Sequence, residues 1–535
     1  MAQLNATDLL LAPRLDRRQV ASLLEPYGFQ EVEKADANLQ AMADDLTARQ
    51  LLAGIIDELL FCLAQAADPD QALNYFERFT RSAVNKIHLF SFLKEAPRTL
   101  EILAKTLGGS PYMAEILIRH PAYLYWVADP QILYQCRKKR DLARELARGL
   151  KSLQTEPQQL NFLRTFKRKE MLQIGVRDLL RLSSVEETLA ALSTLAEALI
   201  SAAYRLCDAS LRGEYGLPIR RGAKALTGFT VFGMGKLGGG ELNFSSDVDL
   251  IYLYASDSEE ATITRSEIQA ASVSAPEYFR RLSQKITSAL ADVTSEGYVY
   301  RVDLRLRPEG KAGNIAYSLD GFKRYYHARG ETWERLALLK AWPVAGDRGL
   351  GLKFLEMVRP FVYDRPFDLK ALNEVRGIKR KIDQRMSVRQ QSRRNVKLGF
   401  GGIREIELVV QALQVSLGGK FPEVCERNTL KALQALCRRQ LISDEEYQAL
   451  SQAYLFLRDV ENKLQMVNDA QTHSIPAKAE EVRACARRLG YEDTDHGRAE
   501  EQFLGDYRRH TGRVNQIFES VFGTSEPLRF RQVSL

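Results

Sequence analysis

GMGKLGGGELNFSSDVDLIYLY, residues 233–254, is the most informative stretch of the sequence. An apolar run at 229–232 precedes the glycines and predicts one strand, and VDLIYLY at 248–254 predicts a second. Five glycines lie between these runs and let the backbone come close to a bulky group. Backbone N–H groups in such a turn can form an anion-binding nest, and Lys236 adds a charge suited to phosphate. The stretch therefore predicts a phosphate-binding loop between two strands.

Two common nucleotide-binding motifs do not account for this loop. The Walker spacing G-x-x-x-x-G-K-[ST] is absent from it. G-M-G-K-L-G does match G-x-G-x-x-G, but that match alone is weak evidence. The carboxylates that follow the loop argue against a dinucleotide-binding fold and favour a different chemistry.

Asp247 and Asp249 stand at the start of the second predicted strand, directly after the glycines. Side chains at positions i and i+2 of a strand point to the same face, so the two carboxylates project together. Adjacent carboxylates repel each other unless a cation lies between them. Because Mg²⁺ is commonly bound by carboxylates together with substrate phosphates, the pair predicts a magnesium site beside the phosphate loop.

A third carboxylate is expected on a neighbouring strand. The pattern YVYRVDLRLRP at 298–308 predicts that strand, and Asp303 is the candidate acid. If the strand continues, Arg305 and Arg307 share the face of Asp303 and help to neutralise phosphate charge. Three carboxylates could hold two metal ions, which would stabilise the attacking and leaving oxygens of an in-line displacement at phosphorus.

The β-patterned segments are confined to the middle of the chain. Before them the apolar spacing is helical, with a helix stop at 108–109 and an N-cap at Ser110. After them a helix is predicted over 403–417. We therefore expect an α+β, predominantly helical fold, in which a small mixed-sheet core is flanked by an N-terminal helical region and a C-terminal helical bundle. The predicted parts are 1–215, 216–346 and 347–523, followed by a tail at 524–535.

The composition excludes several classes of protein. The 535 residues are 45% hydrophobic and 27% charged, which is typical of a soluble globular protein with a sizeable core. No run of about 18 uncharged apolar residues predicts a membrane span, and the N-terminus does not resemble a signal peptide. Six scattered cysteines without a C-x-x-C pair indicate neither a disulfide framework nor a zinc site. We expect a cytoplasmic protein that acts without a membrane.

The net charge of +8 is modest for this length. It suits a surface that meets phosphates or an acidic partner. Because no arm or tail concentrates the charge, it is weak evidence for a nucleic-acid-binding protein. We therefore expect no nucleic-acid partner, and an enzyme directed to RNA or DNA is the less favoured alternative.

The signature G-x-G-K-L-G-G-x-E-L-N-x-x-S-D-x-D-L-I resembles that of the glutamine synthetase adenylyltransferase family, which belongs to the polymerase-β-like nucleotidyltransferases. The resemblance extends over most of the chain. It includes the segments at 109–121, 300–313, 330–341, 396–407 and 453–476.

The resemblance implies an activity and its partners. Enzymes of this family usually contain two similar halves. One half attaches AMP to a tyrosine of glutamine synthetase, and the other removes it by phosphorolysis, in which inorganic phosphate releases ADP. The signalling protein PII and glutamine regulate the balance. The signature occurs once in this chain, and the segments G-x-x-W-E-R and G-G-I-R-E-I-E look more like the N-terminal, AMP-removing half. The AMP-adding half more often reads W-E-H and G-G-I-T-D-I-E.

The resemblance also implies roles for individual residues. The three acids would be the catalytic metal ligands for two Mg²⁺ ions: Asp247, Asp249 and Asp303. The loop residues would hold the nucleotide phosphates: Gly233, Gly235, Lys236, Leu237, Gly238, Gly239 and Ser246. The residues themselves add four basic candidates for the phosphate site: Arg305, Arg307, Lys397 and Arg404.

Phosphorolytic removal of AMP from glutamine synthetase is therefore the expected function, with nucleotide and inorganic phosphate as small ligands and PII as a regulator. Two alternatives remain open. The chain could instead adenylylate glutamine synthetase with ATP and release pyrophosphate, or it could be a non-catalytic module that binds nucleotide or PII. The complete set of carboxylates argues against the last alternative.

Overall fold

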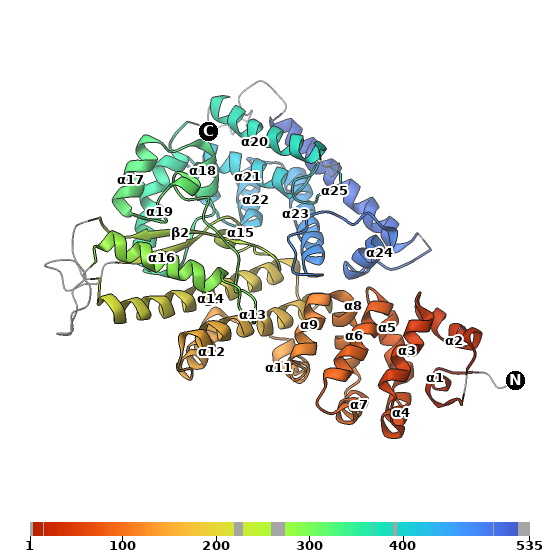
Figure 1. Cartoon of the computed structure of the whole chain (residues 1–535). Coiled ribbons are helices and arrows are strands. Elements are labelled where there is room, and N and C mark those ends of the chain that lie inside the picture. Colours follow the sequence, from red (N-terminus) through yellow and green to blue (C-terminus); the bar gives the residue numbers. More distant parts are fainter. Residues whose placement is uncertain are drawn as a thin grey trace. The chain divides into compact units, whose positions relative to one another are not determined.

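The computed structural model of the chain describes residues 4–13, 15–218, 228–257, 273–366, 369–388, 393–495 and 497–522. The predicted tail at 524–535 lies outside these residues. Figure 1 shows a predominantly helical protein with a small sheet, which confirms the α+β class expected from the sequence.

The chain forms two compact units built from interleaved segments. The first unit contains residues 1–136, 168–188 and 459–507, and the second contains residues 137–167, 189–458 and 508–535. The sheet and every candidate site residue belong to the second unit. The four-part division of the chain that was drawn from its sequence stays a prediction.

The helices before the sheet are α1 (Asp8–Leu11), α2 (Arg17–Leu24), α3 (Val32–Met42), α4 (Leu46–Ala53), α5 (Ile56–Ala64), α6 (Pro69–Ser82), α7 (Lys86–Glu95), α8 (Arg98–Gly109), α9 (Pro111–Arg119), α10 (Tyr123–Val127), α11 (Pro130–Leu133), α12 (Lys139–Lys151), α13 (Glu156–Leu179) and α14 (Val185–Tyr215). The predicted stop at 108–109 is confirmed, because α8 ends at Gly109. Ser110 then caps α9 by accepting a hydrogen bond from the backbone N–H of Met113 at 3.2 Å.

The helices within and after the sheet are α15 (Gly235–Gly239), α16 (Ala275–Ala291), α17 (Leu319–Ala328), α18 (Thr332–Leu338), α19 (Arg348–Tyr363), α20 (Leu369–Val388), α21 (Ile403–Leu417), α22 (Thr429–Arg438), α23 (Asp444–Gln465), α24 (Ala479–Arg488) and α25 (Ala499–Phe522). Short 3₁₀ turns lie at Glu25–Tyr27, Gly310–Ala312 and Pro422–Val424. The helix predicted over 403–417 is confirmed as α21.

The sheet is mixed and has five strands: β1 (Phe229–Gly233), β2 (Val248–Tyr254), β3 (Val302–Asp303), β4 (Ala316–Ser318) and β5 (Trp342–Gly346). β1 lies between β2 and β5 and is antiparallel to both. β3 and β4 are both parallel to β2, and they pair with its beginning and its end respectively. The second predicted strand is confirmed, since β2 covers 248–254.

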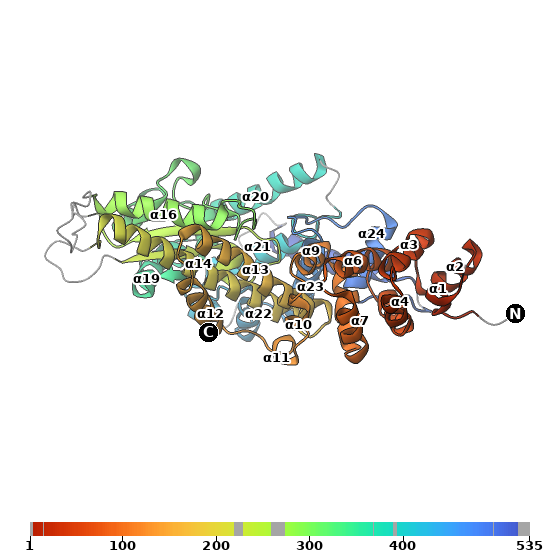
Figure 2. The same cartoon turned by 60° about the horizontal axis from the view of Figure 1, so that its bottom comes forward.

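Helices cover both faces of the sheet. Phe229 of β1 stacks on Phe279 of α16 and on Tyr204 of α14, whereas Phe232 contacts Phe354 of α19. Figures 1 and 2 show α14 and α16 running alongside each other next to the sheet. Burial of these aromatic side chains fixes the strands in place, so the loops at the strand ends are held by a rigid support.

The strand predicted over 298–308 is much shorter than expected. β3 contains only Val302 and Asp303, and the chain turns immediately afterwards. The guanidinium of Arg307 donates to the carbonyls of Leu304 at 2.7 Å and Asn314 at 2.9 Å, which folds the segment into a compact loop. The prediction that Arg305 and Arg307 share a strand face with Asp303 was therefore wrong, because backbone carbonyls of the loop capture Arg307.

One of the described helices, α14, is long and apolar enough to cross a membrane, but 56% of its most apolar window is buried inside the protein. Core helices of soluble proteins pass the same test, so the evidence for a membrane span is weak. Glu197 interrupts the apolar run and bonds with Lys139 at 2.5 Å. The stacking of Tyr204 under the sheet gives α14 a role in the core.

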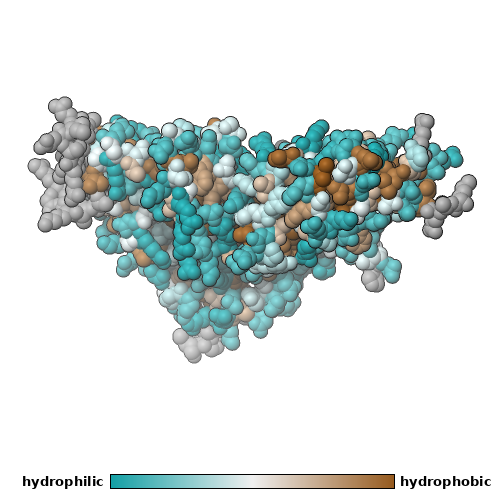
Figure 3. All heavy atoms as spheres, turned by 90° about the horizontal axis from the view of Figure 1, so that it is seen from below, coloured by the Kyte–Doolittle hydropathy of each residue, from teal (hydrophilic) through white to brown (hydrophobic). Residues whose placement is uncertain are grey.

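Hydrophobic surface gathers over the N-terminal helices on the face seen in Figure 3. Large apolar side chains in this part of the first unit are unusually exposed, among them Leu46, Phe61 and Val84.

Candidate functional site

The three predicted acids meet at the beginning of β2. Asp249 of β2 and Asp303 of β3 are directly paired in the parallel register of the two strands. Asp247 precedes β2 by one residue. The expectation that a third acid stands on a neighbouring strand is thus confirmed by the register, although β3 is only two residues long.

The glycine-rich loop lies against these acids. The backbone N–H of Met234 donates to the carbonyl of Asp249 at 2.8 Å, which ties the loop to β2. Gly235 has a φ of +52°, and a Cβ at this position would lie 2.9 Å from Oδ2 of Asp249. Glycine is therefore required here for two reasons, because the backbone is left-handed and because the carboxylate occupies the space of a side chain.

Asp249 is the electrostatic centre of the site. Burial raises the pKa of its carboxyl to about 7, and the neighbouring Asp303 and Asp247 add to the shift. Lys397 and Arg305 act in the opposite direction. A buried carboxylate that is repelled by two others is stabilised by a cation, so the environment of Asp249 favours a bound metal ion.

The other two acids are paired with arginines. Asp247 accepts from Nε of Arg301 at 2.6 Å, and Asp303 forms an ion pair with Arg305 at 2.5 Å. Burial acts to raise the pKa of Asp303, but the hydrogen bonds from Arg305 outweigh it and the pKa is lowered. Among the described residues, no group of three or more acidic, histidine or cysteine side chains is already arranged as a metal site. The donor set nevertheless fits Mg²⁺, which prefers oxygen ligands and needs only a few carboxylates.

Basic side chains from three parts of the chain surround a second buried acid, Glu407 of α21. Burial opposes its ionisation, but Lys340, Arg404, Lys397 and Lys236 outweigh that effect and lower the pKa of Glu407 to about 2. Lys397 acts on both Glu407 and Asp249. The predicted phosphate-site candidates Lys236, Lys397 and Arg404 therefore form one basic region around Glu407, and Lys397 links this region to Asp249.

Other predicted residues have different surroundings. Leu237 is buried, and its side chain packs over Gly233, so the leucine supports the loop from within the core. Ser246 accepts a hydrogen bond from the backbone N–H of Asn243 at 3.0 Å and so stabilises the turn before β2. Arg307 is occupied by loop carbonyls, as described above.

A buried polar network beneath the glycine loop was missed by the sequence analysis. Nζ of Lys340 contacts Oε2 of Glu241 at 2.6 Å, Oγ1 of Thr429 at 3.0 Å and Oε1 of Glu407 at 3.3 Å. Its backbone carbonyl also packs on the loop, since a Cβ at Gly238 would lie only 1.7 Å from that oxygen. The glutamate of the E-L-N part of the signature, Glu241, was a signal for this network. An acid next to glycines and a buried strand is expected to be buried itself, and a buried acid needs a partner.

We expect Gly235→Ala to reduce turnover at least tenfold, because its methyl group would displace Asp249 and the backbone would be strained. Gly240→Ala is the matched control. Gly240 is also left-handed, with a φ of +72°, but a Cβ there would meet no atom within 4 Å. Both variants should lose about 1–2 kcal/mol of stability through backbone strain, measured by urea unfolding. Equal turnover in the two variants would contradict the assigned contact between the loop and Asp249.

Comparison with known proteins matches this site to one family. Residues 100–357 match the family model described as glutamate-ammonia ligase adenylyltransferase. The chain is 36% identical over 425 residues to the bifunctional glutamine synthetase adenylyltransferase/adenylyl-removing enzyme of Nitrosococcus oceani, and this match covers 79% of the chain and 42% of the relative. This chain belongs to the glutamine synthetase adenylyltransferase family. It is therefore a member of a family of nucleotidyltransferases.

Two further relatives carry the same name, bifunctional glutamine synthetase adenylyltransferase/adenylyl-removing enzyme. The match to the protein from Xanthomonas campestris is 40% identical over 390 residues, covering 73% of this chain and 39% of the relative. The match to the protein from Rhizobium meliloti is 35% identical over 445 residues, covering 82% of this chain and 44% of the relative. The chain thus spans about two fifths of the length of these relatives of the adenylyltransferase family.

The C-terminal helices of this family member have a second similarity. Residues 376–522 match the model described as GlnD PII-uridylyltransferase. The matched segment contains Lys397 and Arg404, and it includes the α21 residue Glu407 of the buried network.

Proposed function

We propose that this chain is the AMP-removing half of a glutamine synthetase adenylyltransferase and acts by phosphorolysis. Its substrate is an adenylylated tyrosine of glutamine synthetase, and its products are ADP and the free tyrosine. The observation that carries the proposal is the pairing of Asp249 with Asp303 next to the glycine loop and Lys397. This arrangement provides oxygen ligands for metal ions and a basic region for phosphate within one site.

The proposed reaction is an in-line displacement at the phosphorus of AMP. An oxygen of inorganic phosphate forms a new bond to that phosphorus, and the bond from phosphorus to the tyrosine oxygen breaks. The resulting phosphate-to-phosphate linkage makes ADP, and the tyrosine oxygen takes up a proton. We propose that Asp247, Asp249 and Asp303 hold two Mg²⁺ ions, which supply Lewis-acid stabilisation of the charge on the phosphoryl oxygens.

The basic residues support the AMP-removing direction of the reaction. Adding AMP would require a base near the tyrosine hydroxyl, whose ordinary pKa is about 10. Inorganic phosphate is already largely ionised near neutral pH, so AMP removal requires a second anion pocket instead. Lys397, Arg404 and Arg305 are suited to form that pocket. Arg404 also stands where the AMP-adding half tends to have threonine.

Incubation of adenylylated glutamine synthetase with the protein should release ADP only when inorganic phosphate and Mg²⁺ are present. Chromatography of the nucleotide products measures the outcome directly. Release of free AMP, or labelling of unmodified glutamine synthetase from ATP with release of pyrophosphate, would contradict the proposed direction. The latter result would support the adenylylation alternative.

We expect Arg404→Thr to raise the KM for phosphate at least tenfold while changing the KM for adenylylated glutamine synthetase less than threefold. The guanidinium lies beside Glu407, with Nη1 at 3.3 Å from Oε2, and its loss would remove a positive charge from the phosphate region. Arg439→Thr is a matched control, because Arg439 is a surface residue paired with Glu423. Equal phosphate dependence in the two variants would count against a role for Arg404.

We also propose PII as a regulatory partner and the cytoplasm as the location. The similarity of residues 376–522 to the GlnD PII-uridylyltransferase model supports the first of these proposals. If metal-dependent nucleotide turnover is undetectable with either form of glutamine synthetase, the non-catalytic alternative takes precedence.

A further inference from the structure

A basic cavity of about 500 Å³ lies within the first unit, outside the candidate active site. Its lining includes five basic side chains, Lys105, Arg181, Arg483, Arg487 and Arg488. Only two acids line it, Glu492 and Asp493. The lining therefore has a formal excess of three positive charges.

Arg487 and Arg488, at the end of α24, each donate a hydrogen bond to a backbone carbonyl of another helix. Arg487 donates through Nη2 to the carbonyl of Ala64, the last residue of α5. Arg488 donates through Nε to the carbonyl of Gly109, the last residue of α8, at 2.8 Å. Each bond satisfies a helix carbonyl that has no partner inside its own helix. Among the described residues, neither terminal nitrogen of Arg488 has a hydrogen-bond partner, so this end of the guanidinium remains available to a ligand.

A third guanidinium at the cavity belongs to Arg181, whose backbone is in the left-handed region. Arg181 has a φ of +57°, a backbone conformation that residues other than glycine rarely adopt. Its Nη2 donates to the carbonyl of Leu489, and it lies so close to Gly490 that a Cβ there would be 2.1 Å from it. Strained backbone of this kind persists where the surrounding structure enforces it, and it is frequently found at functional sites.

The charges that face these guanidinium groups do not balance them. Asp493 is paired with Arg483, and Lys105 is paired with Glu101 at 3.3 Å. Asp493, Asp68 and Glu492 act on Arg487 from a distance, and Cys485 and Asp68 act on Arg488. Burial lowers the pKa of both Arg487 and Arg488, which reflects the cost of keeping unbalanced positive charge away from water.

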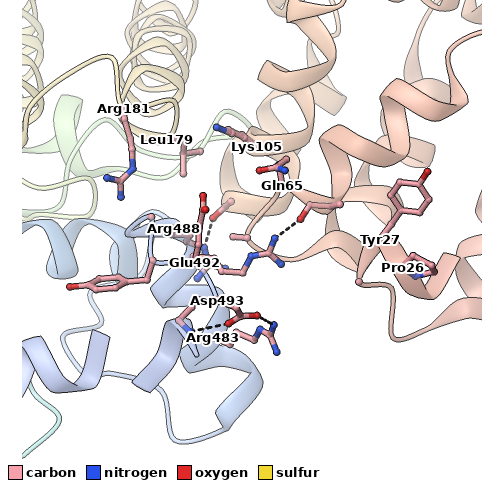
Figure 4. A pocket seen from close by; sticks show the side chains of 18 residues that line it. Pro26, Tyr27, Gln65, Lys105, Leu179, Arg181, Arg483, Arg488, Glu492 and Asp493 are labelled. Atoms are coloured by element: carbon pink, nitrogen blue, oxygen red, sulfur yellow. Dashed lines mark hydrogen bonds and ion pairs between the residues drawn. The ribbon is translucent and has the colours of Figure 1, made fainter. Parts of the chain in front are cut away.

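The opposite end of the cavity has a different chemistry. Figure 4 shows Tyr27 and Pro26 there, with Arg181 at the other end and Arg488 between them. An aromatic and a proline ring provide flat apolar surface, whereas the guanidinium groups bind phosphate oxygens in pairs. The volume is within the usual range for small-molecule sites and is large for a lone inorganic phosphate.

We propose that this cavity binds a small phosphate-bearing metabolite of about mononucleotide size. The phosphate contacts Arg181, Arg487 and Arg488, and the organic part lies toward Tyr27. The site is separate from the proposed phosphorolytic centre, since all of its residues belong to the first unit. Its existence does not depend on the direction of the catalysed reaction.

The test is equilibrium binding of AMP to the full chain in EDTA, with inorganic phosphate and succinate as comparison ligands. Hydrogen exchange of the same samples locates the binding. We expect AMP to protect the backbone amides at 179–182 and 485–493. Inorganic phosphate should compete at higher concentration, and the dicarboxylate should bind at least tenfold more weakly than AMP.

Arg181→Gln should weaken the AMP binding that protects these segments at least tenfold, because it removes one charged hydrogen-bond donor from an exposed residue. Arg17→Gln is the matched control, since Arg17 is a surface residue of the same unit that does not line the cavity. Circular dichroism and unfolding midpoints establish that both variants fold. Protection confined to 229–254, or equal affinity in Arg181→Gln and the control, would overturn the proposal. Tighter binding of succinate than of AMP would replace phosphate with carboxylate as the ligand class.

Discussion

Asp249→Asn is expected to lower nucleotide turnover by roughly 10³-fold or more while the protein stays folded. Asp249 interacts electrostatically with the other two carboxylates and with Lys397, and the glycine loop packs against it. An amide has no charge with which to hold a metal ion, so the charge on the phosphoryl oxygens would lose its stabilisation. Asp247→Asn should have a similar effect for the same reason. Turnover is measured as phosphate-dependent release of ADP from adenylylated glutamine synthetase.

The same variant should be more stable than the wild type when Mg²⁺ is removed with EDTA. The pKa of Asp249 in the folded protein is raised to about 7 from 3.8, so its ionisation destabilises the metal-free fold. The wild type should lose stability relative to Asp249→Asn as pH rises from about 4 to about 7, reaching a difference on the order of 1–3 kcal/mol above that range. Addition of Mg²⁺ should stabilise the wild type and have little effect on the variant.

Asp320→Asn serves as the control for both measurements, because Asp320 is an exposed residue in the first turn of α17. It should retain wild-type turnover, and it should show no stabilisation in EDTA. Near-wild-type turnover in both Asp249→Asn and Asp247→Asn would refute the metal-ligand assignment.

Lys340→Met is expected to destabilise the second unit by about 3–5 kcal/mol, measured from the urea unfolding transition. Burial alone would lower the pKa of Lys340, but the carboxylates of Glu241 and Glu407 raise it, so the ammonium group is charged. Its side chain is 8% exposed, and those of Glu241 and Glu407 are 2% and 9% exposed. Replacement by methionine would leave two buried acids without their central cation.

A double substitution distinguishes the loss of this pairing from a general packing defect. Lys340→Met combined with Glu241→Gln should cost clearly less than the sum of the two single losses, because each single variant already disrupts the same ion pair. Additive losses would indicate that the two side chains do not interact as described. A loss below about 1 kcal/mol for Lys340→Met alone would show that the buried pair contributes little.

The parts of the fold that could be predicted from the sequence are those with strong local signals. The run at 248–254, which is apolar apart from Asp249, predicts β2 because a buried strand needs no polar alternation. Ser110 followed by proline predicts the start of α9 because both residues satisfy the first turn of a helix. Asp247 and Asp249 could be predicted to lie together because side chains at positions i and i+2 of a strand point to the same face.

The remaining features depend on contacts that are distant in sequence. Arg305 and Arg307 alternate as in a strand, but the pattern cannot show that loop carbonyls compete for Arg307. Lys340 lies 99 residues from Glu241, so neither residue reveals the other as its partner. The cavity around Arg488 also combines segments from distant parts of the chain, which a local sequence pattern does not bring together.

The interleaving of the two units has a consequence for the synthesis of the protein. The first unit begins at the N-terminus but needs residues 459–507 to be complete, and the second includes residues after 507. During synthesis, therefore, neither unit can be completed before residue 507 has emerged from the ribosome. No single truncation point yields one unit intact, so a fragment cut at the end of the sheet would lack part of each. The long interval between synthesis of the first helices and synthesis of their late partners leaves apolar surface exposed, so this chain is prone to aggregate while it is being made.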